Sequence, residues 1–177
     1  MKQIYMLGGK ARSGKDTIAG FIKKYYEQKS KKCIIIQIST YIKYYAKKVL
    51  NWDESEETKP REFLQTSGTM IRETFGQDFF INRIIDDIKI LFNYADIIVV
   101  SDVRLPLEFD MVKNTFDNVK NIYVKRDDFD NNLGDRTKHI TEVALDNFKD
   151  YDYIISNNSD LESLRKQIYL ILKEEVK

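Results

Sequence analysis

The sequence has almost none of the residues that build disulfide frameworks or histidine-based metal sites. Cys33 is the only cysteine and His139 the only histidine in 177 residues. A single cysteine excludes an intrachain disulfide and a cysteine-based zinc site. A single histidine excludes a metal site with two histidines and any mechanism that needs two imidazoles. We expect His139 to form local hydrogen bonds rather than to act as a general base.

Long apolar runs are missing as well. No stretch approaches the ~20 apolar residues that cross a bilayer. The apolar segment near the N-terminus, residues 4–7, is followed at once by glycines and charged residues, unlike the apolar region of a signal peptide. We therefore expect a soluble cytoplasmic protein in a reducing compartment, with no membrane partner.

The sequence also lacks an excess of charge of either sign. Lys and Arg number 29, Asp and Glu number 28, and the formal net charge is +1 at pH 7. This balance excludes the broad basic field with which proteins slide on nucleic acid, but it leaves room for a local basic site. The hydrophobic fraction of 42% and the charged fraction of 32% are typical of a globular chain. The length predicts one domain.

Short apolar runs alternate with longer amphipathic segments along the chain. The short runs, which we predict as strands, are residues 4–7, 33–38, 97–100, 122–124 and 153–155. Apolar residues recur at helical spacing in residues 18–25, 41–50, 60–75, 78–92, 107–116 and 161–172. This alternation predicts an α/β fold with a five-stranded parallel sheet and helices on both faces. Ligands of such sheets bind beyond the carboxyl ends of the strands.

The most specific motif follows the first predicted strand. Residues 9–17 read GKARSGKDT, match the G-x-x-x-x-G-K phosphate-binding loop, and lead into an amphipathic helix. Glycines let consecutive backbone N–H groups face one anion, and the start of the helix adds partial positive charge. Lys15 is placed to reach the β- and γ-phosphates. The alternative is a tight turn that binds nothing. The predicted ATP-binding residues are Gly9, Arg12, Ser13, Gly14, Lys15, Asp16 and Thr17.

One position departs from the usual loop. The residue after the lysine, normally a Ser or Thr that binds magnesium, is Asp16, and Thr17 follows it. Asp16 either holds Mg²⁺ through water or simply favours the start of the helix with its negative charge. Thr17 is then the better phosphate contact. The departure argues against the switch GTPases, in which that hydroxyl binds magnesium directly.

A second carboxylate follows the buried run 97–100. Asp102 has the position of a Walker B carboxylate, which helps to place magnesium, and we predict that Asp16 and Asp102 share the ion through water. The alternative for Asp102 is a solvated residue at a strand end. Arg104 lies near the same strand end and is a bidentate donor that suits a phosphate. Its alternative is an ion pair with Asp102 or Glu108.

The predicted helix 60–75 carries a polar stripe. At about 100° per residue, Arg61, Gln65 and Arg72 lie within roughly 40° of one another. Two guanidinium groups and an amide suit a second substrate that carries phosphate and a base, and a solvated surface is the alternative. Gly68 either weakens this helix or permits close approach of its backbone to a ligand. The apolar side of the same helix holds Leu64, Ile71 and Phe75.

Residues 126–138 form a polar segment with basic residues at both ends. Lys125 and Arg126 precede its acidic middle and Arg136 and Lys138 follow it, and a mobile loop with paired basic residues can close over a triphosphate and neutralise the charge that develops during transfer. Exclusion of water by such a lid would prevent wasteful hydrolysis. An ordinary surface loop is the alternative.

Taken in order, these motifs resemble those of the P-loop nucleoside monophosphate kinases, and most of all the phage-type deoxynucleoside monophosphate kinases. The similarity rests on RSGKDT at 12–17, LQTSGT at 64–69 with Arg72, SDVR at 101–104 with Glu108, and HITE at 139–142 followed by Asn157 and Asn158. The SGKDT core is shared with phosphomevalonate kinases. Residues 75–80 read FGQDFF, with phenylalanine where the family pattern has tryptophan.

The resemblance implies a single P-loop kinase domain in three parts. These are a core (residues 1–39, 93–125 and 139–177), a helical monophosphate-binding insert at about 40–92 and a lid at about 126–138. It implies transfer of the ATP γ-phosphoryl group to a deoxynucleoside 5′-monophosphate with Mg²⁺, for nucleotide supply. Lys15, Arg126 and Arg136 would be catalytic. The residues expected to hold the acceptor are Arg61, Gln65, Thr69, Arg72 and Arg104.

Two other functions remain open. One is a P-loop kinase for a different small phosphorylated acceptor, such as phosphomevalonate or dephospho-coenzyme A. The other is a nucleotide-binding ATPase or switch protein that has no small-molecule acceptor. The preferred base and the oligomeric state, a homodimer included, are left open by the sequence.

Overall fold

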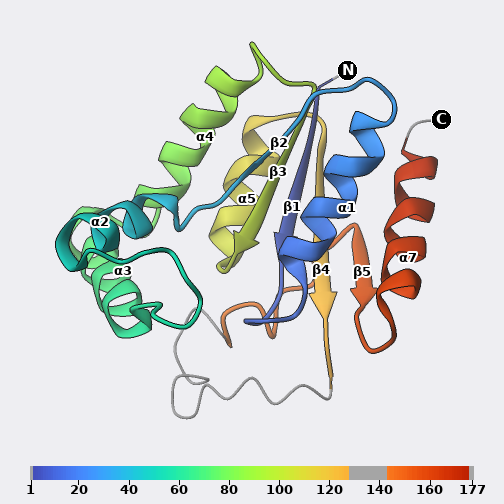
Figure 1. Cartoon of the computed structure of the whole chain (residues 1–177). Helices are drawn as coiled ribbons and strands as arrows, with labels where there is room; N and C mark the ends of the chain where they lie inside the picture. Colours follow the sequence, from blue (N-terminus) through green and yellow to red (C-terminus); the bar gives the residue numbers. More distant parts are fainter. Residues whose placement is uncertain (1, 128–142, 176–177) are drawn as a thin grey trace.

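The computed structural model describes residues 2–127 and 143–175, and these residues form an α/β fold around one parallel sheet (Figure 1). The strands of the described residues are β1 (Gln3–Gly8), β2 (Cys33–Ile36), β3 (Ile97–Val103), β4 (Val119–Lys125) and β5 (Tyr153–Ser156). They lie in the order β2-β3-β1-β4-β5, and every neighbouring pair is parallel. The predicted fold class is confirmed, and each predicted strand coincides with an observed one.

Helices cover both faces of this sheet. Their bounds are α1 (Lys15–Glu27), α2 (Thr40–Leu50), α3 (Arg61–Phe75), α4 (Phe79–Leu91), α5 (Pro106–Thr115) and α7 (Leu161–Glu174). Helices α1 and α7 pack on one face, and α4 and α5 pack on the other. Helices α2 and α3 lie together beside the sheet (Figure 1). No helix among the described residues is long and apolar enough to cross a membrane.

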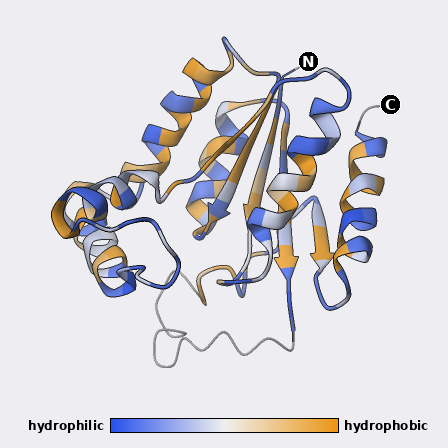
Figure 2. Ribbon diagram, in the orientation of Figure 1, coloured by the Kyte–Doolittle hydropathy of each residue, from blue (hydrophilic) through white to orange (hydrophobic). Residues whose placement is uncertain are grey.

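The central strand shows why the predicted strands are apolar on both faces. Side chains alternate along β1, so Ile4 and Met6 join the core under α4 and α5, whereas Tyr5 and Leu7 join the core under α1 and α7. All four are at most 1% exposed. Figure 2 shows the strands as mostly hydrophobic and the helices as two-sided. Two separate apolar layers therefore hold the sheet, as expected of a parallel sheet buried on both faces.

The junction between β2 and α2 differs from the prediction. The apolar run 33–38 predicts a strand through Ile38, but β2 ends at Ile36. The backbone N–H groups of Ile38 and Ser39 donate to the carboxylate of Asp102, over 2.6 and 3.1 Å. This long-range bond bends the chain away from the sheet and into α2, which begins after Ser39.

Candidate active site at the carboxyl ends of the strands

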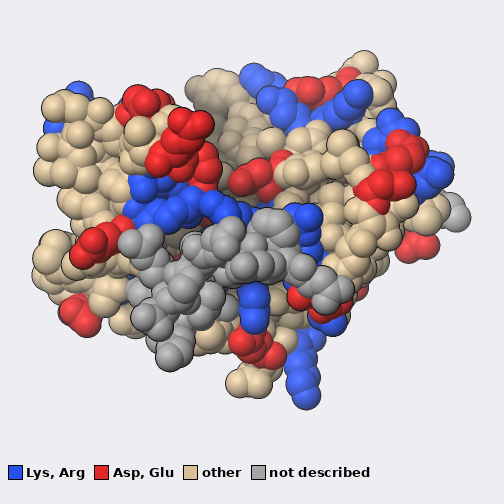
Figure 3. All heavy atoms as spheres, turned by 60° about the horizontal axis from the view of Figure 1, so that its bottom comes forward, with Lys and Arg blue, Asp and Glu red and all other residues tan. Residues whose placement is uncertain are grey.

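A large cavity lies where the parallel strands end. It has a volume of about 730 Å³ and is lined by the loop after β1, the ends of β2 and β3, helix α3 and the loop after β5. Figure 3 shows a group of Lys and Arg side chains at this end of the molecule. The lining cations, Arg12, Lys15, Lys43, Lys59, Arg61, Arg72, Arg104 and Arg126, outnumber the lining acids, Asp16, Glu56, Asp102 and Glu108. Such a basic lining is suited to phosphate groups.

The loop after β1 has the backbone shape that a phosphate-binding loop needs. Gly9 and Gly14 have φ angles of 142° and 104°, in a region that L side chains rarely adopt. A Cβ atom on Gly14 would lie only 2.5 Å from Nδ2 of Asn157. That Asn157 amide donates a 2.8 Å hydrogen bond to the carbonyl of Ser13. The loop after β5 therefore braces the loop after β1, at a spot where only glycine leaves enough space.

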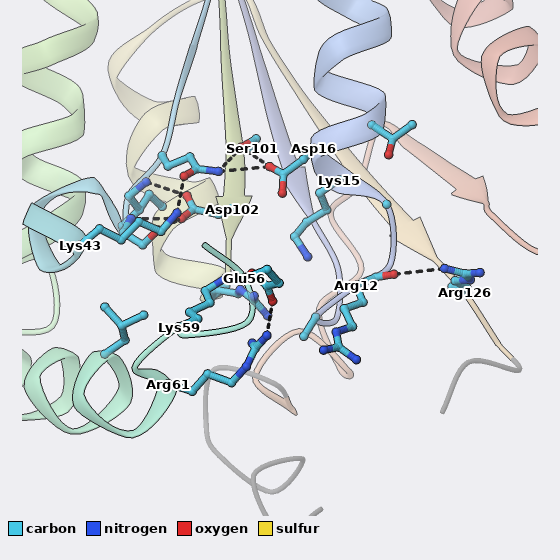
Figure 4. A pocket seen from close by; sticks show the side chains of 18 of the residues that line it. Arg12, Lys15, Asp16, Lys43, Glu56, Lys59, Arg61, Ser101, Asp102 and Arg126 are labelled. Carbon is cyan, nitrogen blue, oxygen red and sulfur yellow. Dashed lines mark hydrogen bonds and ion pairs between the residues drawn. The ribbon is translucent and has the colours of Figure 1, made fainter. Parts of the chain in front are cut away.

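Lys15 is held in the middle of this loop. The residue is 6% exposed, and its Nζ donates to the carbonyl oxygens of Gly9 and Lys10, both at 2.7 Å. The side chain thus curls back over the loop and lines the cleft (Figure 4). A phosphate oxygen in the loop would be a stronger acceptor for this ammonium group than a neutral carbonyl oxygen, because an anionic acceptor strengthens the hydrogen bond.

Asp16 stands where phosphate-binding loops normally have a Ser or Thr, and two neighbouring side chains hold its carboxylate. Oδ1 of Asp16 accepts from the hydroxyl of Ser101 at 2.9 Å and from Nε2 of Gln37 at 3.1 Å. Gln37 Nε2 also lies 3.2 Å from the Ser101 hydroxyl. Three elements, namely α1, β3 and the end of β2, therefore meet at one carboxylate at the cleft wall (Figure 4).

Helix α3 presents its predicted polar stripe to the same cleft. Arg61, Gln65 and Arg72 all line the cavity, so the stripe is not merely a solvated surface. Arg61 forms an ion pair with Glu56, which also binds Lys59 at 2.9 Å. One carboxylate therefore pairs with two of the cations that line the cleft.

The other side of α3 agrees with the prediction only in part. Leu64 and Ile71 pack against the core, but Phe75 is 64% exposed. The close approach predicted at Gly68 is made to a neighbouring helix, because a Cβ there would lie 3.1 Å from Cδ1 of Ile42 in α2. Gly68 therefore allows α2 and α3 to pack closely.

Arg72 is anchored to the core by a buried carboxylate. Its Nη2 lies 3.6 Å from Oε1 of Glu108, whose side chain is 2% exposed. Oε2 of Glu108 accepts from the backbone N–H groups of Arg104 and Leu105, over 2.7 and 3.0 Å. Complete burial raises the pKa of Glu108, and the two backbone donors and Arg72 oppose that shift. The guanidinium also stacks 5.0 Å above the ring of Phe80.

Most of the residues that the sequence analysis singled out converge on this cleft. The lining includes Arg12, Gly14, Lys15, Asp16, Thr17, Arg61, Gln65, Arg72, Asp102, Arg104 and Arg126. Gly9, Ser13 and Thr69 do not belong to that lining. Arg136 and His139, and all but the start of the predicted lid, lie outside the described residues.

Several lining residues were not anticipated from the sequence. They are Gln37, Lys43, Glu56, Lys59 and Asn157. Asn157 carried part of the family resemblance, so a signal existed for it, but its contact with the phosphate-binding loop follows only from the strand order. The other four belong to no motif. They reach the cleft because β2 ends early and the chain turns back before α3.

Comparison with known proteins agrees with this arrangement. A family model described as deoxynucleotide monophosphate kinase matches residues 26–168. The match begins after the phosphate-binding loop, so the loop is an independent observation. Comparison with the curated proteins gives no match.

Solved structures of similar fold include small-molecule kinases. The APS kinase of Mycobacterium tuberculosis in complex with AMPPNP and APS is similar over 97% of this chain and 98% of its own, with a TM-score of 0.57 at 11% identity. The shikimate kinase of Bacteroides thetaiotaomicron and the thymidylate kinase of Ehrlichia chaffeensis give TM-scores of 0.53 and 0.52. Each is 11% identical, and each match covers 97% of this chain and 98% of the other. At this identity the likeness establishes the fold alone.

Proposed function

Because the chain belongs to the deoxynucleotide monophosphate kinase family, we propose that it transfers the γ-phosphoryl group of ATP to a (deoxy)nucleoside 5′-monophosphate and releases the two diphosphates. The observation that carries this proposal is the shared cleft. A phosphate-binding loop and the guanidinium groups of α3 line one cavity of about 730 Å³, which is within the size range of small-ligand sites. An ATPase or switch protein has no need of a second basic wall.

The ATP triphosphate would occupy the loop after β1. Backbone N–H groups of the loop and the start of α1 would surround the β- and γ-phosphates, and Lys15 would exchange a loop carbonyl for a phosphate oxygen. The Ser13 hydroxyl lies in the same loop and is buried without a hydrogen-bond partner among the described residues. It would donate to a phosphate oxygen. Thr17, which lines the cleft one residue beyond Asp16, is the proposed hydroxyl contact.

The acceptor would lie against α3. Arg61, Gln65 and Arg72 form one wall, Arg104 at the end of β3 forms another, and Thr69 remains a proposed contact from the sequence alone. Nε of Arg72 is buried without a hydrogen-bond partner among the described residues, and an acceptor phosphate would supply one. The monophosphate would also compete with the Glu56 carboxylate for Arg61. A phosphate dianion attracts the guanidinium group more strongly than a monoanion, so the site would favour the dianion.

Transfer in such a site depends mainly on position and charge. Phosphoryl transfer passes through a transition state whose charge is spread over the equatorial oxygens, so cations around the γ-phosphate lower the barrier. Lys15 would neutralise part of that charge from the loop. Arg126, whose Nη1 lies 3.4 Å from the carbonyl of Arg12, and Arg136 would add to it from the lid proposed at about 126–138.

Magnesium, when bound, would neutralise the phosphate charge and align donor and acceptor. The donor set of the cleft suits it. Mg²⁺ prefers oxygen ligands and usually takes one or two carboxylates together with water and substrate phosphates. The cleft wall offers the carboxylate of Asp16, whereas both oxygens of Asp102 accept hydrogen bonds from Ile38 and Ser39. The described residues include no cluster of three or more His, Cys, Asp or Glu that would hold a metal without substrate.

An acceptor panel tests the proposal. The purified chain is incubated with ATP, Mg²⁺ and each ribo- or deoxynucleoside monophosphate in turn, and ADP release is followed. We expect release to depend on the presence of a nucleoside monophosphate. Release that no nucleotide stimulates, or that only phosphomevalonate or dephospho-coenzyme A stimulates, would exclude the proposed acceptor.

A further inference from the structure

On the cleft wall, a carboxylate stands where a phosphate-binding loop normally has a hydroxyl, and a hydroxyl stands where a carboxylate is usual. Magnesium in such proteins is held by a hydroxyl directly after the loop lysine and by a carboxylate at the end of a neighbouring strand. Here the residue after Lys15 is a carboxylate, Asp16, and the residue directly after the buried run 97–100 is a hydroxyl, Ser101. The two groups contact each other at 2.9 Å. The site therefore keeps one carboxylate and one hydroxyl, with their positions reversed.

Asp102, the carboxylate that the sequence placed beside magnesium, is engaged elsewhere. Oδ1 accepts from the backbone N–H of Ile38, and Oδ2 accepts from the backbone N–H and the hydroxyl of Ser39. Ser39 directly precedes α2 and occupies its N-cap position. Because the start of a helix carries unpaired N–H groups and partial positive charge, a carboxylate there stabilises the helix. Both oxygens of Asp102 are thus used to hold α2 against the end of β3.

Asp16 differs in the way its oxygens are used. Both of its hydrogen bonds, from Ser101 and from Gln37, end on Oδ1, and among the described residues neither involves Oδ2. Asp16 is exposed and lines the cleft, whereas Ser101 is fully buried behind it. The carboxylate is therefore fixed from the protein side and open on the ligand side.

We propose that Asp16 is the magnesium-facing group of this site, that Ser101 is a positioning residue that orients it, and that Asp102 anchors α2 instead of binding the metal. This inference rests on the proposed function, because it assumes a magnesium nucleotide as the ligand. Gln37 completes the arrangement. Its Nε2 donates to Asp16, and its Oε1 accepts from Lys43, so a third element fixes the same carboxylate. A hydroxyl supplies one donor and two acceptor sites, and the Ser101 hydroxyl donates to Asp16.

The test compares nucleotide binding with and without metal, in the absence of any acceptor. Calorimetric titration with ATP is carried out in Mg²⁺ and in EDTA, and the ratio of the two dissociation constants is the readout. Loss of a residue that orients a metal ligand typically costs about 10- to 100-fold in metal affinity. We therefore expect Ser101→Ala to reduce the ratio by about that factor, and Ser101→Thr, which keeps the hydroxyl, to retain it. Thermal melts establish that each variant is folded.

Two further variants separate this arrangement from the alternatives. Asp102→Asn should lower the melting temperature and keep the metal ratio. The double variant Asp16→Ala/Ser101→Ala should lose no more of the ratio than Asp16→Ala alone, because Ser101 acts through Asp16.

Three results would overturn the inference. They are an unchanged ratio in Ser101→Ala, additive losses in the double variant, and loss of the ratio in Asp102→Asn. A wild-type ratio near one would do so as well. Since no acceptor is present in the titration, a failure of the kinase proposal in the acceptor panel would be seen separately.

Discussion

Arg72 of α3 and Glu108 of α5 form a buried ion pair, with 3.6 Å between Nη2 and Oε1. The pair joins the helix that presents the acceptor wall to the helix that follows β3. Glu108 simultaneously accepts from the backbone N–H groups of Arg104 and Leu105, which directly precede α5. One carboxylate therefore sets both the position of a cleft arginine and the start of a core helix.

Replacement of that carboxylate should destabilise the fold. Glu108→Ala leaves a buried guanidinium without its anion and two N–H groups without an acceptor. Breaking a buried pair in this way costs about 3–5 kcal/mol, which corresponds to a fall of roughly 6–20 °C in melting temperature for a chain of this size. Glu73→Ala, at an exposed position next to Arg72 on α3, is the matched control and should change stability by less than about 0.5 kcal/mol. Equal melting temperatures for the two variants would show that the pair contributes nothing.

Lys15→Ala should abolish transfer while leaving the protein folded. The Lys15 ammonium donates to two carbonyl groups of the phosphate-binding loop, so we expect its removal to change the loop more than the packing of the apolar layers. A lost electrostatic contact to the transferring group lowers kcat by at least about 100-fold. Lys10→Ala is the control, because the Lys10 side chain is 53% exposed and its Nζ pairs with Asp146 at 3.3 Å on the surface. A large fall in the melting temperature of ligand-free Lys15→Ala would assign the residue a structural role instead.

Two glycines provide a matched pair for testing the loop. Gly14→Ala introduces a Cβ at a φ of 104° and within 2.5 Å of the Asn157 amide, and such strain costs about 1–3 kcal/mol. Gly20 lies in the middle of α1 with nothing within 4 Å of its missing Cβ. Gly20→Ala should therefore stabilise the chain by roughly 0.5–1 kcal/mol. Denaturant unfolding measures both changes, and the account requires that they have opposite signs.

Cys33 should be unreactive in the folded protein. It is 3% exposed in β2, and burial raises the pKa of its thiol to about 12. At pH 8 the thiolate is then on the order of 10⁻⁴ of the population, against roughly a quarter for an unperturbed thiol. Because the folded state holds this proton more tightly than the unfolded state, the stability that Cys33 contributes is complete below about pH 8.5 and declines as the pH rises toward 12. Iodoacetamide labelling at pH 8, with and without 6 M guanidinium, measures the effect. Rapid labelling of the native protein would contradict this burial.

The sequence predicts the sheet and the helices well because their signals are local. Runs such as 97–100 show a buried strand directly, and the spacing of apolar residues identifies α3 and α4. The phosphate-binding loop is equally local, because its glycines and its lysine lie within a few residues of one another. The same holds for the stripe of Arg61, Gln65 and Arg72, which the helical period alone places on one face.

What the sequence could not predict depends on contacts between distant segments. The early end of β2 is caused by Asp102, which lies more than sixty residues further along the chain. The sequence allows Gly68 to be interpreted as a position where a ligand approaches the helix backbone, but the side chain that lies close to it is Ile42 of α2. The pairing of Asp16 with Ser101 likewise follows from β3 lying next to β1, and no spacing in the sequence reveals that order.

The most direct test of the central claim is the fate of the transferred phosphoryl group. The chain is incubated with Mg²⁺, ATP labelled at the γ-phosphate and a deoxynucleoside monophosphate, and the labelled products are separated. The account predicts that the label appears in the deoxynucleoside diphosphate, in a one-to-one ratio with the ADP formed. Label that appears instead as inorganic phosphate, at a rate unaffected by the acceptor, would contradict it.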